Sequence, residues 1–284
     1  MVSPEKTLFS GSRDYIVSEE LMNIVNIAIA LQKPLLLKGE PGTGKTMLAQ
    51  AIADSLGQRL IVWNIKSTTK AQDGLYTYDV LQRLYDSQFA GEGVADIKRY
   101  IKLGKLGEAF SADRQVVLLI DEIDKADLEF PNDLLWELDK MEFFINETGE
   151  HIKAGERPIV IITSNAEKEL PDAFLRRCVF HYIAFPDPAM MRRIVLVHFE
   201  RLHDHILQQA MEAFYWIRGL RGIQKKPSTA ELVDWVRALG LSGIPVEQIV
   251  QEIPFAGVLL KKDEDVAVME KERAKRGRSS APAN

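Results

Sequence analysis

The sequence predicts an α/β fold: a parallel β-sheet with helices on both faces, followed by a small all-α region. Two observations predict this fold. Short, continuous runs of apolar and β-branched residues alternate with helical stretches in the first part of the chain, and such runs are typical of strands covered on both faces. After residue 186 the sequence shows helical patterns and no convincing strand.

Four apolar runs are predicted strands, and they span residues 35–37, 60–65, 116–120 and 159–163. A helix is predicted before the first of them, because Ser18 fits the N-cap position and an apolar stripe follows at helical spacing. A second helix is predicted from Met47 to Leu56, where Gly57 ends it. Because helical stretches separate the strands, we expect the strands to be parallel.

The later helices carry their own start and stop signals. Asp187 fits the N-cap of the first, with Pro188 in its first helical position. Ser228 and Glu231 form a capping box for a later helix, which Gly240 is expected to end.

These patterns predict three parts of the chain. An α/β domain is expected over residues 1–186 and a helical domain over residues 187–260. Residues 261–284 are dense in charge and then rich in Ser, Ala and Pro, which predicts a disordered tail.

The composition argues against several classes of protein, namely nucleic-acid-binding, membrane and secreted proteins. The chain has 284 residues and a net charge of −5, which gives no general attraction to nucleic acid or to an anionic membrane. Its apolar runs are too short to cross a bilayer, and its first residues lack the basic and apolar segments of a signal peptide. The single cysteine, Cys178, fits a reducing compartment, so we expect a cytoplasmic protein.

The segment 39–46, GEPGTGKT, matches the phosphate-loop pattern G-x-x-x-x-G-K-[ST] and lies between a predicted strand and a predicted helix. Its glycines let backbone N–H groups turn inward around phosphates. Lys45 is expected to reach the β- and γ-phosphates of a nucleotide, and Thr46 to hold Mg²⁺. The predicted nucleotide-binding residues here are Gly39, Glu40, Pro41, Gly42, Thr43, Gly44, Lys45, Thr46 and Met47.

Polar residues follow two later strands. Asp121 and Glu122 end the run at residues 116–120, at the edge of a parallel sheet where ligands bind. We expect Asp121 to complete the Mg²⁺ site, mostly through water, and Glu122 to act as general base on the attacking water. Asn165 follows the run at 159–163 and could orient that water or contact the γ-phosphate; a loop asparagine bonded to its own backbone is the alternative.

With these three motifs in this order, the sequence resembles the AAA+ superfamily, and in particular its MoxR branch. The segments 15–21 and 100–106 are also similar to MoxR proteins, and the resemblance covers about residues 14–255. It implies a P-loop NTPase core of five strands with a helical lid, in a ring that is usually hexameric, with ATP and Mg²⁺ at subunit interfaces. It also implies an insert in the second helix at about residues 67–93 and a hairpin at about 141–158, and both could face a substrate.

Residues 170–178 resemble the family segment that ends in an arginine finger. Arg177 aligns best with the finger, which would stabilise charge on the phosphoryl group bound by a neighbouring subunit, and Arg176 is the alternative. A third possibility is that Arg177 is a surface arginine that makes only a local ion pair. Many relatives also have an arginine at the start of a lid helix. This chain has Lys225 and Lys226 there, so a lysine replaces the arginine or the contact is absent.

The resemblance implies an ATP-hydrolysing motor subunit that remodels or matures a protein partner, as MoxR relatives do, often beside a protein with a von Willebrand factor A domain. One alternative is a motor or clamp acting on nucleic acid, against which the acidic charge balance counts. A second is a nucleotide-gated scaffold with little turnover, against which the intact Glu122 counts.

Overall fold

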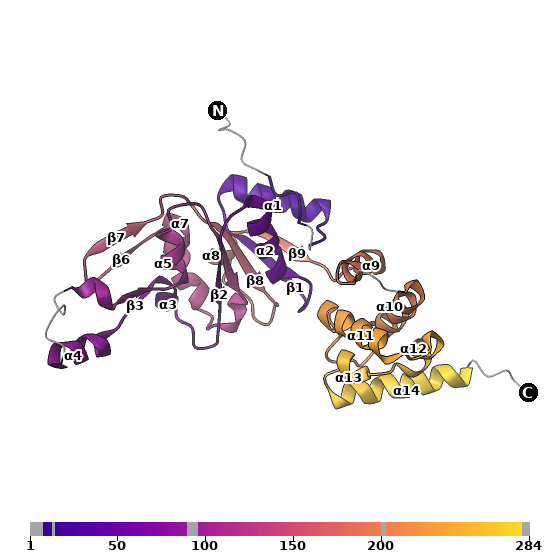
Figure 1. Cartoon of the computed structure of the whole chain (residues 1–284). Helices are drawn as coiled ribbons and strands as arrows, with labels where there is room; N and C mark the ends of the chain where they lie inside the picture. The colour runs from indigo at the N-terminus through magenta and orange to yellow at the C-terminus, as the bar shows by residue number, and fades with distance from the viewer. Residues whose placement is uncertain (1–7, 13–14, 90–95, 200–202, 280–284) are drawn as a thin grey trace, which may run out of the picture. The chain divides into compact units, whose positions relative to one another are not determined.

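The computed structural model describes residues 8–12, 15–89, 96–199 and 203–279 (Figure 1). The chain divides into two compact units with a boundary between Ala184 and Phe185, and the second unit also takes in residues 41–43. In the described residues, no helix combines the length and the apolar character that crossing a membrane requires.

The first unit contains a five-stranded sheet in the order β2-β5-β8-β1-β9, and each neighbouring pair is parallel. This sheet confirms the predicted fold class. Its strands are β1 (Leu35–Gly39), β2 (Leu60–Asn64), β5 (Val117–Asp121), β8 (Ile159–Ser164) and β9 (Val179–Ile183). Four of them match the predicted runs. The position of β9 was not predicted, because this edge strand alternates half-buried residues with the exposed Phe180 and Tyr182.

Helices pack on both faces of the sheet, since successive strand residues point to opposite faces. Leu35 and Leu37 of β1 pack in one core with α1 (Glu19–Leu31) and α2 (Lys45–Leu56). Leu36 packs in a second core with residues of α3 (Ala71–Leu75), α5 (Lys105–Phe110), α6 (Phe130–Asp133) and α7 (Leu135–Lys140). The predicted helix start at Ser18 is confirmed, because its side chain accepts a hydrogen bond from the Leu21 N–H.

The remaining elements of this unit connect the sheet strands. Between β2 and β5 lie α3 (Ala71–Leu75), β3 (Tyr76–Tyr78), α4 (Val80–Phe89), η1 (Ile97–Tyr100), β4 (Ile101–Leu103) and α5 (Lys105–Phe110). Residues 67–93, where an insert is expected, fall in this segment, and residues 90–93 lie outside the described residues. After β5 come η2 (Ile123–Lys125), α6 (Phe130–Asp133), α7 (Leu135–Lys140), an antiparallel hairpin of β6 (Glu142–Ile145) and β7 (Glu150–Lys153), and, after β8, α8 (Asp172–Leu175).

The second unit is helical in its described part, with α9 (Pro188–Val197), α10 (Asp204–Gly219), α11 (Thr229–Ser242), α12 (Val246–Glu252), α13 (Ala256–Leu259) and α14 (Asp263–Ser279). Asp187 caps α9, and Ser228 with Glu231 forms the capping box of α11, as predicted. The predicted end of α11 at Gly240 is wrong. The helix continues to Ser242, and Gly243 with a φ of 65° takes the left-handed position that ends it.

The prediction of a disordered tail is wrong for residues 263–279, which form α14. Two features of the tail explain its order. Met269 is buried in the apolar core of the helical unit. Asp265 is fully buried, and its carboxylate accepts hydrogen bonds from the N–H groups of Gln224 (2.7 Å) and Lys225 (3.1 Å). In the sequence, these few anchoring residues could not be distinguished from the many charged residues around them.

We expect Asp265→Ala to destabilise the helical unit by about 2–3 kcal/mol, because the substitution leaves two backbone N–H groups without a charged acceptor. The measurement is urea unfolding followed by circular dichroism and tryptophan fluorescence. Asp263→Ala is the matched control, since Asp263 is an exposed aspartate in the first turn of the same helix. Equal unfolding midpoints for the two variants would show that Asp265 does not anchor the tail.

Candidate functional site

The glycine-rich loop connects β1 to α2 with a backbone that requires glycine at two positions. Gly42 and Gly44 have φ values of 75° and 85°, which residues with a side chain rarely adopt. Gly44 is also the N-cap of α2, and this helix start has no side-chain hydrogen bond. The N–H groups in the first turn of a helix attract anions, so the loop has the local geometry of a phosphate site.

Lys45 is buried beneath this loop, and its ammonium group bonds to the loop backbone. Its Nζ donates hydrogen bonds to the carbonyl oxygens of Gly39 and Glu40, both at 2.9 Å. Burial lowers the pKa of Lys45, while the carboxylates of Asp124, Asp121, Glu122 and Glu40 oppose that shift. A buried ammonium that bonds neutral carbonyls retains a strong preference for an incoming anion.

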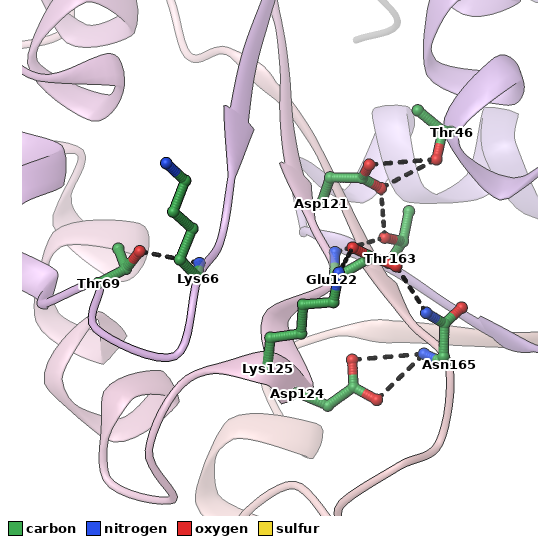
Figure 2. Close-up of polar contacts among 9 residues, drawn as sticks. All are labelled: Thr46, Lys66, Thr69, Asp121, Glu122, Asp124, Lys125, Thr163 and Asn165. Carbon is green, nitrogen blue, oxygen red and sulfur yellow. Dashed lines mark hydrogen bonds and ion pairs between the residues drawn. The ribbon is translucent and has the colours of Figure 1, made fainter.

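Three residues from different elements meet at the carboxyl end of the sheet (Figure 2). The Thr46 hydroxyl, from the first turn of α2, lies 3.0 and 3.2 Å from the two carboxylate oxygens of Asp121 at the end of β5. Thr163 of β8 is fully buried, and its hydroxyl donates a 2.6 Å hydrogen bond to Asp121 Oδ1. The carboxylate of Asp121 is therefore oriented by hydroxyl groups on two sides.

Glu122 is held by both its backbone and its side chain. Its φ of 58° lies in the left-handed region, and its N–H donates to Thr163 Oγ1 at 2.8 Å. Its Oε1 accepts a 2.8 Å hydrogen bond from Asn165 Nδ2, and its Oε2 pairs with the ammonium of Lys125. That hydrogen bond with Glu122 raises the pKa of Lys125. In this arrangement, both carboxylate oxygens of Glu122 are engaged (Figure 2).

Asp124 anchors the loop that carries Asn165. It is buried, and its carboxylate accepts hydrogen bonds from the N–H groups of Asn165, at 3.3 and 3.1 Å, and Glu167, at 2.9 Å. Sequence reasoning missed Asp124, Thr163 and Lys125. A polar Thr163 at the end of an apolar run and the acidic Asp124 next to Asp121 and Glu122 are the signals that could have indicated the first two.

The oxygen atoms around Thr46 and Asp121 suit Mg²⁺. This ion binds oxygen ligands and usually takes only one or two carboxylates from a protein, with water and substrate phosphate completing its shell. A hydroxyl and a carboxylate 3.0 Å apart, directly beside the glycine-rich loop, match that requirement. The described residues contain no group of three or more His, Cys, Asp or Glu residues that could hold a metal ion.

The other predicted residues have different surroundings. Arg177 does not join this group: its guanidinium bonds to the Asp139 carboxylate and to the Ala173 carbonyl oxygen. Arg176 is exposed, and its side chain has no partner among the residues that the structure describes. Met47 is exposed in the first turn of α2, and Lys225 and Lys226 lie in the second unit just before α11. The roles predicted for these residues stay predictions.

Comparisons with known proteins agree with this fold and these motifs. The family model "ATPase family associated with various cellular activities (AAA)" matches residues 35–186. Midasin of Dictyostelium discoideum is 45% identical over 56 residues, which are 20% of this chain and 1% of midasin. Fidgetin-like protein 1 of Xenopus laevis is 25% identical over 64% of this chain and 25% of that protein. The pachytene checkpoint protein 2 homolog of Gallus gallus is 28% identical over 85% of this chain and 56% of that protein.

A solved structure of a mutant of Thermotoga maritima RuvB has the same fold, with a TM-score of 0.54 and 16% sequence identity. The similarity covers 92% of this chain and 72% of the RuvB chain. Residues 35–186 are more than half of the 284 residues, and they contain the glycine-rich loop, Asp121 with Glu122, and Asn165. The chain therefore belongs to the ATPase family associated with various cellular activities.

Proposed function

We propose that this chain hydrolyses ATP and uses the cycle of binding and hydrolysis to remodel or mature a protein partner, as a MoxR-like AAA+ subunit. The observation that supports hydrolysis most strongly is the connected group of Thr46, Asp121, Glu122 and Asn165 beside the glycine-rich loop. It combines a site for a phosphate-bound metal ion with a carboxylate that can activate water.

Each residue has a separate task in this proposal. Lys45 leaves the loop carbonyls and binds the β- and γ-phosphates, because its ammonium group makes stronger hydrogen bonds to charged phosphate oxygens than to neutral carbonyl oxygens. Thr46 and Asp121 would hold Mg²⁺, which would neutralise phosphate charge. Thr163 keeps the Asp121 carboxylate in its orientation. Glu122 takes a proton from the water that attacks the γ-phosphorus, while the bond from that phosphorus to the bridging oxygen breaks and ADP leaves.

Glu122 must first free one of its oxygens, because Asn165 and Lys125 engage both of them. Lys125 is the partner more easily displaced. Its side chain is 43% exposed, so water can replace the pair at little cost. Asn165 has its backbone anchored by the buried Asp124, so it can keep its contact with the other oxygen. Asn165 then orients Glu122 toward the water.

Assembly and the finer assignments belong to the same proposal. We infer a ring, with six subunits as the expected number, in which ATP binds at subunit interfaces and Arg177 of one subunit acts on the nucleotide of the next. Residues 187–260 would serve as the lid of the nucleotide site. Lys225 or Lys226 would supply the positive charge that an arginine supplies in many relatives. The partner would be a protein client, with a von Willebrand factor A domain protein as a candidate, and the exposed Leu81 and Phe89 of α4 would suit such a contact.

Lys45→Ala tests the phosphate site. We expect at least about 100-fold weaker ATP binding, because two charge-assisted contacts to phosphate are lost and each is worth about 1.5–3 kcal/mol. The measurement is equilibrium binding of ATP by the full chain, by isothermal titration calorimetry. Lys33→Ala is the control, since Lys33 is an exposed lysine just before β1. Unchanged affinity in Lys45→Ala would refute the assignment of the loop.

A further inference from the structure

Acceptors from two different elements hold the guanidinium group of Arg177. Its Nε donates to Asp139 Oδ2 at 2.7 Å, and its Nη1 donates to the Ala173 carbonyl oxygen at 2.9 Å. Asp139 lies in the last turn of α7, and Ala173 lies in α8. Two contacts on different nitrogen atoms restrict both the position and the plane of the guanidinium group.

Asp139 is itself fixed in place by a second arginine. Arg157, just before β8, donates hydrogen bonds to the carbonyl oxygens of Leu138 (2.9 Å) and Asp139 (3.1 Å). These contacts satisfy carbonyl groups at the end of α7 that have no partner within the helix. Burial lowers the pKa of Arg157, and the Asp139 charge opposes that shift. Asp139, whose carboxylate binds Arg177, therefore has a backbone that Arg157 holds in place.

Arg177 keeps donors for another ligand while it is held. A guanidinium group has five N–H donors, and Nη2 of Arg177 has no partner among the residues that the structure describes. The side chains of Arg177 and Asp139 are 43% and 44% exposed. An ion pair this exposed adds little to the stability of the fold. Together with the second hydrogen bond, to the Ala173 carbonyl oxygen, the pair reduces the number of positions that the long Arg177 side chain samples.

We propose that Asp139 is a positioning residue that orients Arg177 for the nucleotide bound by a neighbouring copy of this chain. The inference rests on the proposed function, in which Arg177 acts in trans. Side chains that act on a transition state lose much of their effect when they are displaced by about 1 Å. Held by Asp139 and Ala173, the guanidinium presents its remaining donors to a phosphoryl group without first having to be ordered.

Asp139→Ala should lower kcat for ATP hydrolysis about tenfold, because Arg177 then samples many positions. The affinity for ATP should stay unchanged, since the variant keeps its own phosphate loop. Asp139→Asn keeps an acceptor oxygen and should retain an intermediate kcat. Asp133→Ala is the matched control, because Asp133 is an exposed aspartate at the end of the preceding helix α6, and it should hydrolyse ATP at the wild-type rate.

Two further measurements separate positioning from a general structural effect. Mixing Asp139→Ala with Lys45→Ala should restore part of the hydrolysis, since intact pockets then meet correctly held arginines of the other variant. In the Arg177→Ala background, adding Asp139→Ala should lower the rate no further.

The outcomes also separate this inference from the proposed function. A slow Arg177→Ala together with a wild-type kcat for Asp139→Ala would overturn the role of Asp139 alone. A loss in Asp139→Ala that persists in the Arg177→Ala background would overturn it as well. So would a loss that mixing with Lys45→Ala does not restore, when mixing Arg177→Ala with Lys45→Ala does restore hydrolysis. Wild-type hydrolysis by Arg177→Ala would overturn the role of Arg177, and that of Asp139 with it.

Discussion

Glu122→Gln is expected to bind ATP with near wild-type affinity and to hydrolyse it about 10²–10⁴-fold more slowly, the usual contribution of a general base. Glutamine keeps the shape of the side chain and an oxygen that can accept the hydrogen bond now made by Asn165 Nδ2 at 2.8 Å. It cannot take a proton from water, so ATP should stay bound and the nucleotide-bound assembly should persist.

Single-turnover hydrolysis and equilibrium ATP binding, measured on the same preparation, separate the two effects. Glu129→Gln is the matched control, because Glu129 is an exposed glutamate in the segment that follows Glu122, and its turnover should stay at the wild-type value. If Glu122→Gln also turns over at the wild-type rate, another group activates the water.

Arg177→Ala is expected to bind ATP normally and to hydrolyse it about 10³–10⁵-fold more slowly, the range found for arginine fingers. Arg177 contacts Asp139 and Ala173 in the isolated chain rather than Asp121 or Glu122. Its loss should therefore spare the pocket of its own subunit, and the defect should appear in the pocket of the next subunit.

Mixing Arg177→Ala with Lys45→Ala tests whether Arg177 acts on the pocket of the next subunit. Each variant alone should be inactive, the first because it lacks the finger and the second because its pocket is empty. Interfaces between an intact pocket and an intact Arg177 should recover part of the activity, provided that subunits exchange. An Arg177→Ala protein that assembles and hydrolyses ATP normally would move the role to Arg176, and the mixing experiment would then be repeated with that residue.

The elements that could be predicted best are those whose conformation depends only on residues close in the sequence. The glycine-rich loop is one, because its positive φ values require glycine at positions 42 and 44. The buried strands are another, because continuous apolar runs permit few alternatives. Asp121, Glu122 and Asn165 could be placed at one edge of the sheet because parallel strands end together there.

What could not be predicted depends on contacts between distant residues. Thr163 bonds to Asp121 and Glu122 only because β5 and β8 are neighbours in the sheet. Similarly, α14 is ordered by the buried Asp265 and Met269, which composition alone does not distinguish from other residues of a charged tail. The pair of Arg177 and Asp139 joins residues 38 positions apart, and the local sequence does not indicate it.

Phosphate release from ATP by the full chain tests the proposed function most directly. The release is measured over the range of protein concentrations in which the chain assembles, and light scattering follows the assembly. We expect Mg²⁺-dependent release whose rate per chain rises with assembly to a plateau, because a neighbouring copy supplies Arg177. We expect no release from Lys45→Ala. Phosphate release that never exceeds the Lys45→Ala background, at any concentration and with Mg²⁺ present, would contradict the claim that this chain is an ATP-hydrolysing subunit.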